Sequence, residues 1–255
     1  MKLAFALLLA LGSAIALNWG YVAQHRGATE VPPLALRRPL VSLRALFAHR
    51  RWLAGFSVGL GGWVLYVGAL ALAPLSIVQA ASAGGIGVLA LLVPERLAPI
   101  ERAGVAVAIA GLVVLAVSLG SATGGRHAAA SHVAVWLGVS AAVAGVAAAS
   151  RGAVGLGAAA GVLFATGDVA TKAVTGGRFP FVPALLAAYG LAFACLQLGF
   201  QRGRALTTIG IATLLTNAVP IVAGIAIFGE HASVMRVISF VLVVVGAVLL
   251  ARART

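Results

Sequence analysis

The sequence predicts an all-α integral membrane protein in which about nine transmembrane helices form an inverted-topology repeat. Hydrophobic residues make up 62% of the 255 residues and charged residues only 9%, far less charge than the surface of a soluble domain needs. The apolar runs are 17 to 24 residues long and do not alternate with polar residues. Runs of that length cross the hydrocarbon layer as helices, whereas barrel strands are about ten residues long and alternate.

We interpret residues 1–255 as a single polytopic membrane domain. Its first repeat half covers residues 3–120, a connecting span covers 133–149, and the second half covers 153–251. The nine expected spans are residues 3–22, 52–72, 75–93, 103–119, 133–149, 153–171, 181–200, 205–228 and 234–250.

The one long connection, residues 23–51, is not expected to cross the membrane, because its six arginines would each be costly at the bilayer centre. Four apolar residues recur in it at spacings of 4, 3 and 4, which places them on one helical face. Pro39 can start such a helix at its first position. We therefore expect a short amphipathic helix on the membrane surface, with a solvated basic loop as the alternative. The four apolar residues are Leu36, Leu40, Leu43 and Phe47.

The distribution of lysine and arginine predicts the orientation. If residues 23–51 lie in the cytoplasm, 13 of the 18 basic residues fall on the cytoplasmic side and 5 on the other. This bias follows the positive-inside rule. The N-terminus is then expected outside and the C-terminus in the cytoplasm of a multi-pass cell membrane protein, and the net charge of +13 reflects topology, not nucleic-acid binding.

Matching residues at fixed offsets predict the internal repeat. An offset of 135 residues pairs Glu95 with Glu230 and Gly111 with Gly246. Paired spans are five crossings apart, so the two halves have opposite orientations, a plan that recurs in secondary transporters. Chance matching of small residues is the alternative. The same offset pairs Gly85 with Pro220, and an offset of 150 residues pairs Asn18 with Asp168.

Asp168 is the foremost candidate for a functional residue, because an ionisable group inside a membrane span is costly unless it has a role. It follows Gly157, Gly161 and Phe164 at spacings of 4, 3 and 4, so it lies on a small-residue face that packs against other helices. Asp168 would bind solute or carry protons. The alternative is a structural ion pair with Lys172, one turn further on, whose side chain can also reach the headgroups.

Asn18 occupies the place in the first span that Asp168 has in the sixth, and either binds solute or bonds a neighbouring helix. The third and eighth spans carry further polar groups, and Gly85 and Pro220 weaken these two helices at matching positions. Weakened helices at corresponding points of two halves indicate a transporter site. We expect a cavity between spans 1, 3, 6 and 8, with ordinary packing as the alternative. The substrate-binding candidates are Asp168, Asn18, Gln79, Asn217 and Thr213.

The remaining acidic and reactive residues suggest structure, not catalysis. Glu95 and Glu230 end spans 3 and 8, where they stabilise the next helix through its dipole or act in gating. Glu30 and Glu101 are expected in solvated loops. No nucleophile–base pair, phosphate loop or metal-ligand spacing is visible, so an enzyme is disfavoured and no cofactor is expected.

The pattern resembles the drug/metabolite transporter superfamily in its EamA-like form. The resemblance rests on residues 65–74, on Pro94-Glu95-Arg96-Leu97 leading to Gly104 and Gly111, and on 214–220 with Gly229-Glu230 and Gly246. That family has ten spans, whereas here a long basic loop stands where a second span would lie. In this respect the chain is more similar to the NIPA-like branch, which is associated with magnesium transport. Residues 10–13, which a basic turn follows, are also similar to the opening of that branch. The resemblance implies an inverted-repeat carrier and leaves the substrate open.

Three functions compete at this point. The first is a secondary transporter that moves a metabolite, amino acid or drug-like molecule by alternating access, with proton coupling and a homodimer left open. The second is a NIPA-like divalent cation transporter, in which Asp168 would be the metal ligand, because magnesium keeps its waters and needs few carboxylates. The third is a membrane scaffold or accessory subunit, which predicts that Asp168 tolerates asparagine.

Overall fold

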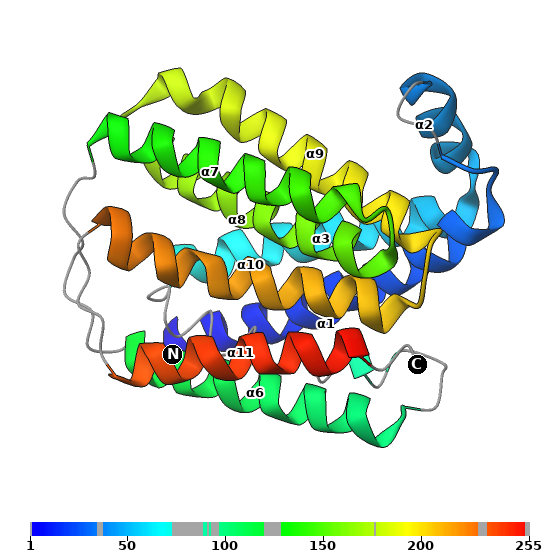
Figure 1. The fold of residues 1–255 in the computed structure, drawn as a ribbon. Helices are drawn as coiled ribbons and strands as arrows, with labels where there is room; N and C mark the ends of the chain where they lie inside the picture. Colours follow the sequence, from blue (N-terminus) through cyan, green and yellow to red (C-terminus); the bar gives the residue numbers. More distant parts are fainter. Residues whose placement is uncertain are drawn as a thin grey trace.

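The computed structural model describes residues 2–34, 38–72, 89–90, 92, 97–119, 129–175, 177–228 and 234–252, and all regular structure in these ranges is helical. Figure 1 shows the helices running roughly along one direction, with only α2 projecting from the bundle. The elements are α1 (Lys2–Glu30), α2 (Pro39–Ala48), α3 (Arg50–Leu72), α6 (Pro99–Leu119), α7 (Ala130–Ala149), α8 (Ala153–Thr175), a 3-10 turn (Phe179–Phe181), α9 (Val182–Phe200), α10 (Ala205–Phe228) and α11 (Val234–Arg252).

The predicted all-α class with several long apolar helices is confirmed. Eight long helices coincide with eight of the nine expected spans, and α10 has the expected bounds. The ninth, residues 75–93, lies almost wholly outside the described residues. Within the described residues, four helices are long and apolar enough to cross a membrane. They are Ala4–Glu30, Ala130–Ala149, Ala153–Ala170 and Phe179–Phe200.

The boundary predicted for the first span is wrong, because α1 continues eight residues past Val22 to Glu30. The extension is stabilised by packing: Ala23, Gln24 and Ala28 are all buried. The loop between α1 and the surface helix is therefore shorter than expected. A helix does begin at Pro39, and α2 exposes 80% of Leu40 while Leu46 is buried against the bundle.

Glycine brings α1 and α3 together as an antiparallel pair. A Cβ on Gly20 would lie 2.6 Å from the carbonyl oxygen of Gly55, and one on Gly27 would lie 2.7 Å from the backbone of Trp52. Small residues at such crossings allow the backbones to approach closely, which is how helices gain packing energy in lipid.

Replacing Gly20 with alanine is therefore expected to lower the free energy of unfolding in detergent by about 1–3 kcal/mol, the usual cost of overpacking. Gly61 on the same pair of helices is the matched control, because nothing lies within 4 Å of a Cβ built there. Gly61→Ala should leave stability unchanged or raise it by up to about 1 kcal/mol, since alanine is the better helix former. Thermal unfolding of both variants checks this, and equal effects would contradict the packing described for Gly20.

Two further helix pairs complete the bundle. Figure 1 shows α6 and α11 side by side, and they run antiparallel: Gly104 lies against Leu249, and Gly111 against Leu242 and Val243. In contrast, α8 and α10 run parallel, because Gly157 meets Thr208 and Gly161 meets Ala212.

Gly157 and Gly161 of the expected small-residue face thus pack on α10. Asp168, which was expected on the same packed face, is instead exposed and accepts a hydrogen bond from Tyr189 on α9. Helix α8 is the most buried of the four long apolar helices, and it also packs against α7 and α9.

Four basic connections and the C-terminal end of α11 meet at one end of the bundle, the right-hand end in Figure 1. The end of α1, the start of α3 and the link from α9 to α10 converge there. Arg202 donates to the carbonyl of Arg151 between α7 and α8, and Arg204 pairs with Glu101 at the start of α6. The segments expected in the cytoplasm therefore share one end, which we call the basic end.

Candidate functional site

Asp168 carries an exposed carboxylate on the otherwise most buried helix, α8. The hydroxyl of Tyr189 on α9 donates a 2.7 Å hydrogen bond to Asp168 Oδ1. Tyr189 is positioned by the absence of a side chain at Gly167, where a Cβ would lie 2.9 Å from the tyrosine ring. The ring of Phe164, one turn earlier on α8, is tilted against Tyr189 with 6.2 Å between centroids.

The chain has three tyrosines, and all three come from different helices to the surroundings of Asp168. Besides Tyr189, the phenol groups of Tyr21 on α1 and Tyr66 on α3 are close enough to interact electrostatically with this carboxylate. Side chains on helices lean toward the N-terminus of their own helix. Because α1 and α3 are antiparallel, Tyr21 and Tyr66 lean toward each other, at the level where Gly62 meets Leu17.

Asn18 lies on the same face of α1 as Tyr21, one turn toward the N-terminus. The side chain is 5% exposed, and its amide nitrogen donates 2.8 Å to the carbonyl of Ala14. Its Oδ1 atom is buried and has no hydrogen-bond partner among the described residues. A buried acceptor without a partner is costly, so this oxygen is a point at which a bound molecule would gain a hydrogen bond.

Thr213 and Asn217 on α10 are half-buried, and the hydrogen bond described for Asp168 comes from Tyr189, not from either of them. The amide of Asn217 instead donates 2.7 Å to the carbonyl of Thr213, as Asn18 does to Ala14. Neighbouring Thr216 bonds the carbonyl of Ala212. Gln79, Gly85, Glu95 and Glu230 lie outside the described residues, as do the side chains of Lys172 and Pro220.

A chain of buried polar groups joins the two predicted halves near the basic end. The indole nitrogen of Trp52 donates 2.7 Å to Gln197, whose amide donates 2.9 Å to Gln24. Both glutamines are 3% exposed and Trp52 is fully buried. The three residues come from α3, α9 and α1, so this chain links the first half to the second.

More contacts between the halves lie in the same layer. His25 donates from Nε2 to the carbonyl of Gly203 at 2.8 Å. Gln201 accepts from the backbone N–H of Leu34 and donates to the carbonyl of Ala28. Together with the Trp52–Gln197–Gln24 chain and the Glu101–Arg204 ion pair, we call these contacts the polar layer.

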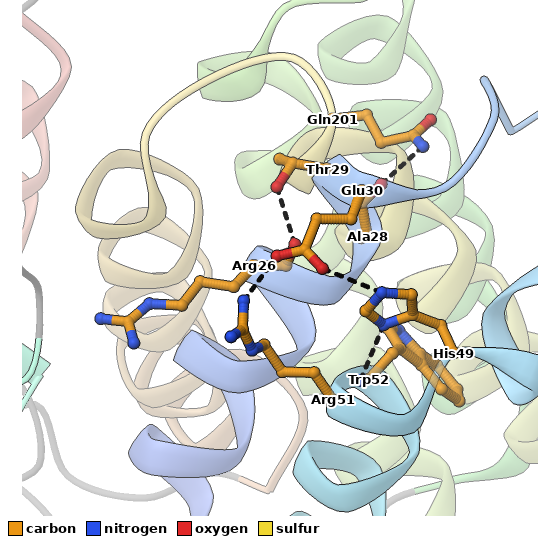
Figure 2. Close-up of polar contacts among 8 residues, drawn as sticks. All are labelled: Arg26, Ala28, Thr29, Glu30, His49, Arg51, Trp52 and Gln201. Carbon is orange, nitrogen blue, oxygen red and sulfur yellow. Dashed lines mark hydrogen bonds and ion pairs between the residues drawn. The ribbon is translucent and has the colours of Figure 1, made fainter.

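The expectation that Glu101 is solvated is wrong. Glu101 is 1% exposed, accepts 2.8 Å from the backbone N–H of Ala98, and forms an ion pair with Arg204 before α10. Its sequence position at the start of α6 suggested a loop, but the side chain of Arg204, the residue before α10, pairs with it. Glu30 does lie near the surface, where Figure 2 shows its carboxylate between Arg51 and His49.

Sequence reasoning missed the tyrosines and the glutamines. The sequence did contain a signal for the tyrosines. Tyrosine in membrane proteins concentrates at the lipid–water interface, whereas Tyr66 and Tyr189 lie well inside predicted spans. Gln197 was also a polar amide within an apolar span. The expected cavity between spans 1, 3, 6 and 8 omitted α3 and α9, which supply two of the three tyrosines.

This arrangement can bind a small molecule. Asp168 supplies a carboxylate, and the rings of Phe164 and Tyr189 beside it supply apolar and π surface. In the part of the chain that the structure describes, no three His, Cys, Asp or Glu side chains gather as a metal centre would require.

Comparison with known proteins gives one informative match. A stretch of 83 residues is 37% identical to the probable magnesium transporter NIPA9 of Arabidopsis thaliana. It covers 32% of this chain, and the chain spans only about a quarter of the plant protein, 24% of its length. No family model matches the chain, and no solved structure matches it.

Proposed function

We propose that this chain is a secondary transporter that moves a small solute across the membrane by alternating access. The observation that carries the proposal is the position of Asp168 relative to the polar layer. Among the described residues, the polar layer joins the predicted halves at the basic end, whereas Asp168 lies beyond it with an exposed carboxylate. A carrier needs such a site with a closed barrier on one side of it.

The barrier at the basic end has two components. One is the polar layer. The other is apolar: Phe200, Leu206 and Ile209 are at most 1% exposed and pack in one cluster with Leu250. Gln197 and Tyr189 are eight residues apart on α9, so the barrier begins about 12 Å along the helix from the site. Opening to the basic end would require these contacts between halves to separate.

The inverted repeat remains part of this proposal, and the contact between α6 and α11 supports it. Gly111 packs against Val243, and Gly246 packs against Ala108. The offset of 135 residues that pairs Gly111 with Gly246 also pairs Ala108 with Val243. The repeat offset therefore relates the Gly111–Val243 contact to the Gly246–Ala108 contact. Two antiparallel helices related by a pseudo-two-fold axis would make such a pair of contacts.

Helix pairing near the site supports the same plan. Helix α1 packs on α3 as α8 packs on α9, and each pair is antiparallel. Gly62 approaches Leu17 on the first pair, and Gly167 approaches Tyr189 on the second. We further propose the cytoplasm for the basic end, following the charge bias of the sequence.

A panel of solutes tested by thermal unfolding of the purified chain examines this function. A ligand that binds only the folded state stabilises it by about 2.7 kcal/mol at a hundredfold excess over its dissociation constant. We expect at least one small metabolite, amine or divalent cation to raise the unfolding temperature, and Asp168→Asn to abolish the shift. Stabilisation that survives in Asp168→Asn would show that the solute binds elsewhere.

A magnesium transporter is the second candidate, and the similarity to the Arabidopsis protein favours it. Magnesium keeps several waters and is often held by one or two carboxylates. Asp168 and Asn18 Oδ1 would then contact a hydrated ion. Rescue of growth in a magnesium-starved host by the wild-type chain, and its loss in Asp168→Asn, would establish this function over the organic-solute carrier.

A further inference from the structure

We infer that the candidate site takes a monovalent organic cation, namely a protonated primary or secondary amine with an apolar body. This inference rests on the proposed transport function and narrows its substrate class. It is argued from three properties of the site: the sign of its charge, the kind of hydrogen-bonding groups it leaves for a ligand, and the aromatic rings around them.

The hydrogen bonding of the site favours a ligand that carries hydrogen-bond donors. Asp168 is an acceptor, and within the described residues its carboxylate receives one hydrogen bond, from Tyr189. A ligand that binds this carboxylate must bring N–H or O–H groups, and an ammonium group carries two or three N–H donors at one point.

The charge of the site favours a monovalent cation as its ligand. One carboxylate is balanced by one positive charge, whereas a divalent ion would keep an excess charge in surroundings of low dielectric constant. The structure describes no second acidic side chain near Asp168, and the described residues contain no group of three metal-ligating side chains. Asp168 lies about 22 Å along α8 from the basic end, remote from Glu101 and Glu30.

The aromatic rings beside the carboxylate favour an organic ion over a metal ion as the ligand. Phe164 and Tyr189 form a tilted pair of rings directly beside the carboxylate. Aromatic faces attract cations through their quadrupole and also cover apolar groups. A strongly hydrated metal ion gains little from such walls, because it keeps its water. An alkylammonium ion gains from both the charge and the rings.

Binding to the chain in lipid nanodiscs tests the inference with three probes: phenethylammonium, its neutral analogue 2-phenylethanol, and Mg²⁺. We expect calorimetry to detect binding of phenethylammonium, and the alcohol to bind at least about tenfold more weakly because it lacks the charge. Asp168→Asn should abolish binding of the amine.

Two pairs of variants isolate the rings. Tyr189→Phe and Phe164→Tyr keep the aromatic face and should change the affinity for phenethylammonium by less than about threefold. Tyr189→Leu and Phe164→Leu remove the face and should each weaken binding by about 2- to 30-fold, the range of a cation–π contact. Gel filtration and circular dichroism show which variants keep the helical fold. If a leucine variant does not fold, the aromatic replacement at the same position is compared with the wild type instead.

Each other outcome contradicts the inference in a distinct way. Equal binding of the alcohol would exclude a role for charge, and unchanged binding in folded leucine variants would exclude a role for the rings. Binding of Mg²⁺ without the amine, lost in Asp168→Asn, would overturn the amine while leaving the transport proposal intact. Absence of binding by all three probes, together with no stabilising solute in the panel, would overturn both.

Discussion

Asp168→Asn is expected to reduce solute transport in proteoliposomes by at least about thirtyfold while leaving the helical fold intact. Asparagine has nearly the same shape and still accepts the hydrogen bond from Tyr189, so the main loss is the charge. Removing one partner of a desolvated charge pair costs about 2–5 kcal/mol or more, which corresponds to this loss or a larger one. Initial rates of uptake for wild type and variant measure it.

Two controls make this result specific. Glu30→Gln removes a carboxylate that is 46% exposed and paired with Arg51 at the surface, and it should leave transport unchanged. Tyr189→Phe removes the hydrogen bond to Asp168 but keeps its charge, so the loss should be clearly smaller than for Asp168→Asn. If Asp168 only formed a structural ion pair with Lys172, the double variant Asp168→Asn with Lys172→Met would restore transport. That result would contradict a role of Asp168 in solute binding.

Arg204→Ala is expected to lower the free energy of unfolding by about 3–5 kcal/mol, the cost of breaking a buried ion pair by removing one partner. Glu101 is 1% exposed and would keep only the backbone N–H of Ala98. The comparison is Arg51→Ala, because Arg51 and Glu30 form an exposed pair worth at most about 1 kcal/mol. Denaturant titration of both variants in detergent measures the difference.

A double variant separates the buried charge from general packing. Replacing Glu101 with glutamine and Arg204 with methionine removes both charges and keeps the side-chain volume. This change should recover much of the stability lost in Arg204→Ala, since apolar or neutral isosteres of a buried ion pair are often tolerated. If Arg204→Ala and Arg51→Ala cost the same, the ion pair does not hold α6 to α10 as described.

The helices were largely predictable from sequence, and their contacts were not. The apolar run predicted the bounds of α10, because Arg202 and Arg204 precede it and Gly229 and Glu230 follow it in the sequence. The end of α1 was missed because Gln24, His25 and Arg26 read as loop, although Gln24 is buried through its bond to Gln197 and His25 bonds Gly203. A polar residue reads as exposed until its partner on another helix is known.

The same limit applies to the site. Asp168 could be selected from sequence because an acid within a span is costly, and Asn18 because it occupies the matching position. That Tyr189 bonds this acid, with the ring of Phe164 against the tyrosine, depends on how α8 and α9 pack, which periodicity alone does not determine. Glu101 illustrates the reverse case, since a residue assigned to a solvated loop forms the buried half of an ion pair.

Counterflow in proteoliposomes tests the central claim most directly. Vesicles carrying the protein are loaded with an unlabelled solute that stabilises it, then diluted into the labelled solute. A carrier that alternates between two states exchanges one for the other, so labelled solute should accumulate transiently above its external concentration, and Asp168→Asn should abolish the overshoot. Wild-type vesicles without an overshoot for every stabilising solute would contradict alternating access and favour a scaffold.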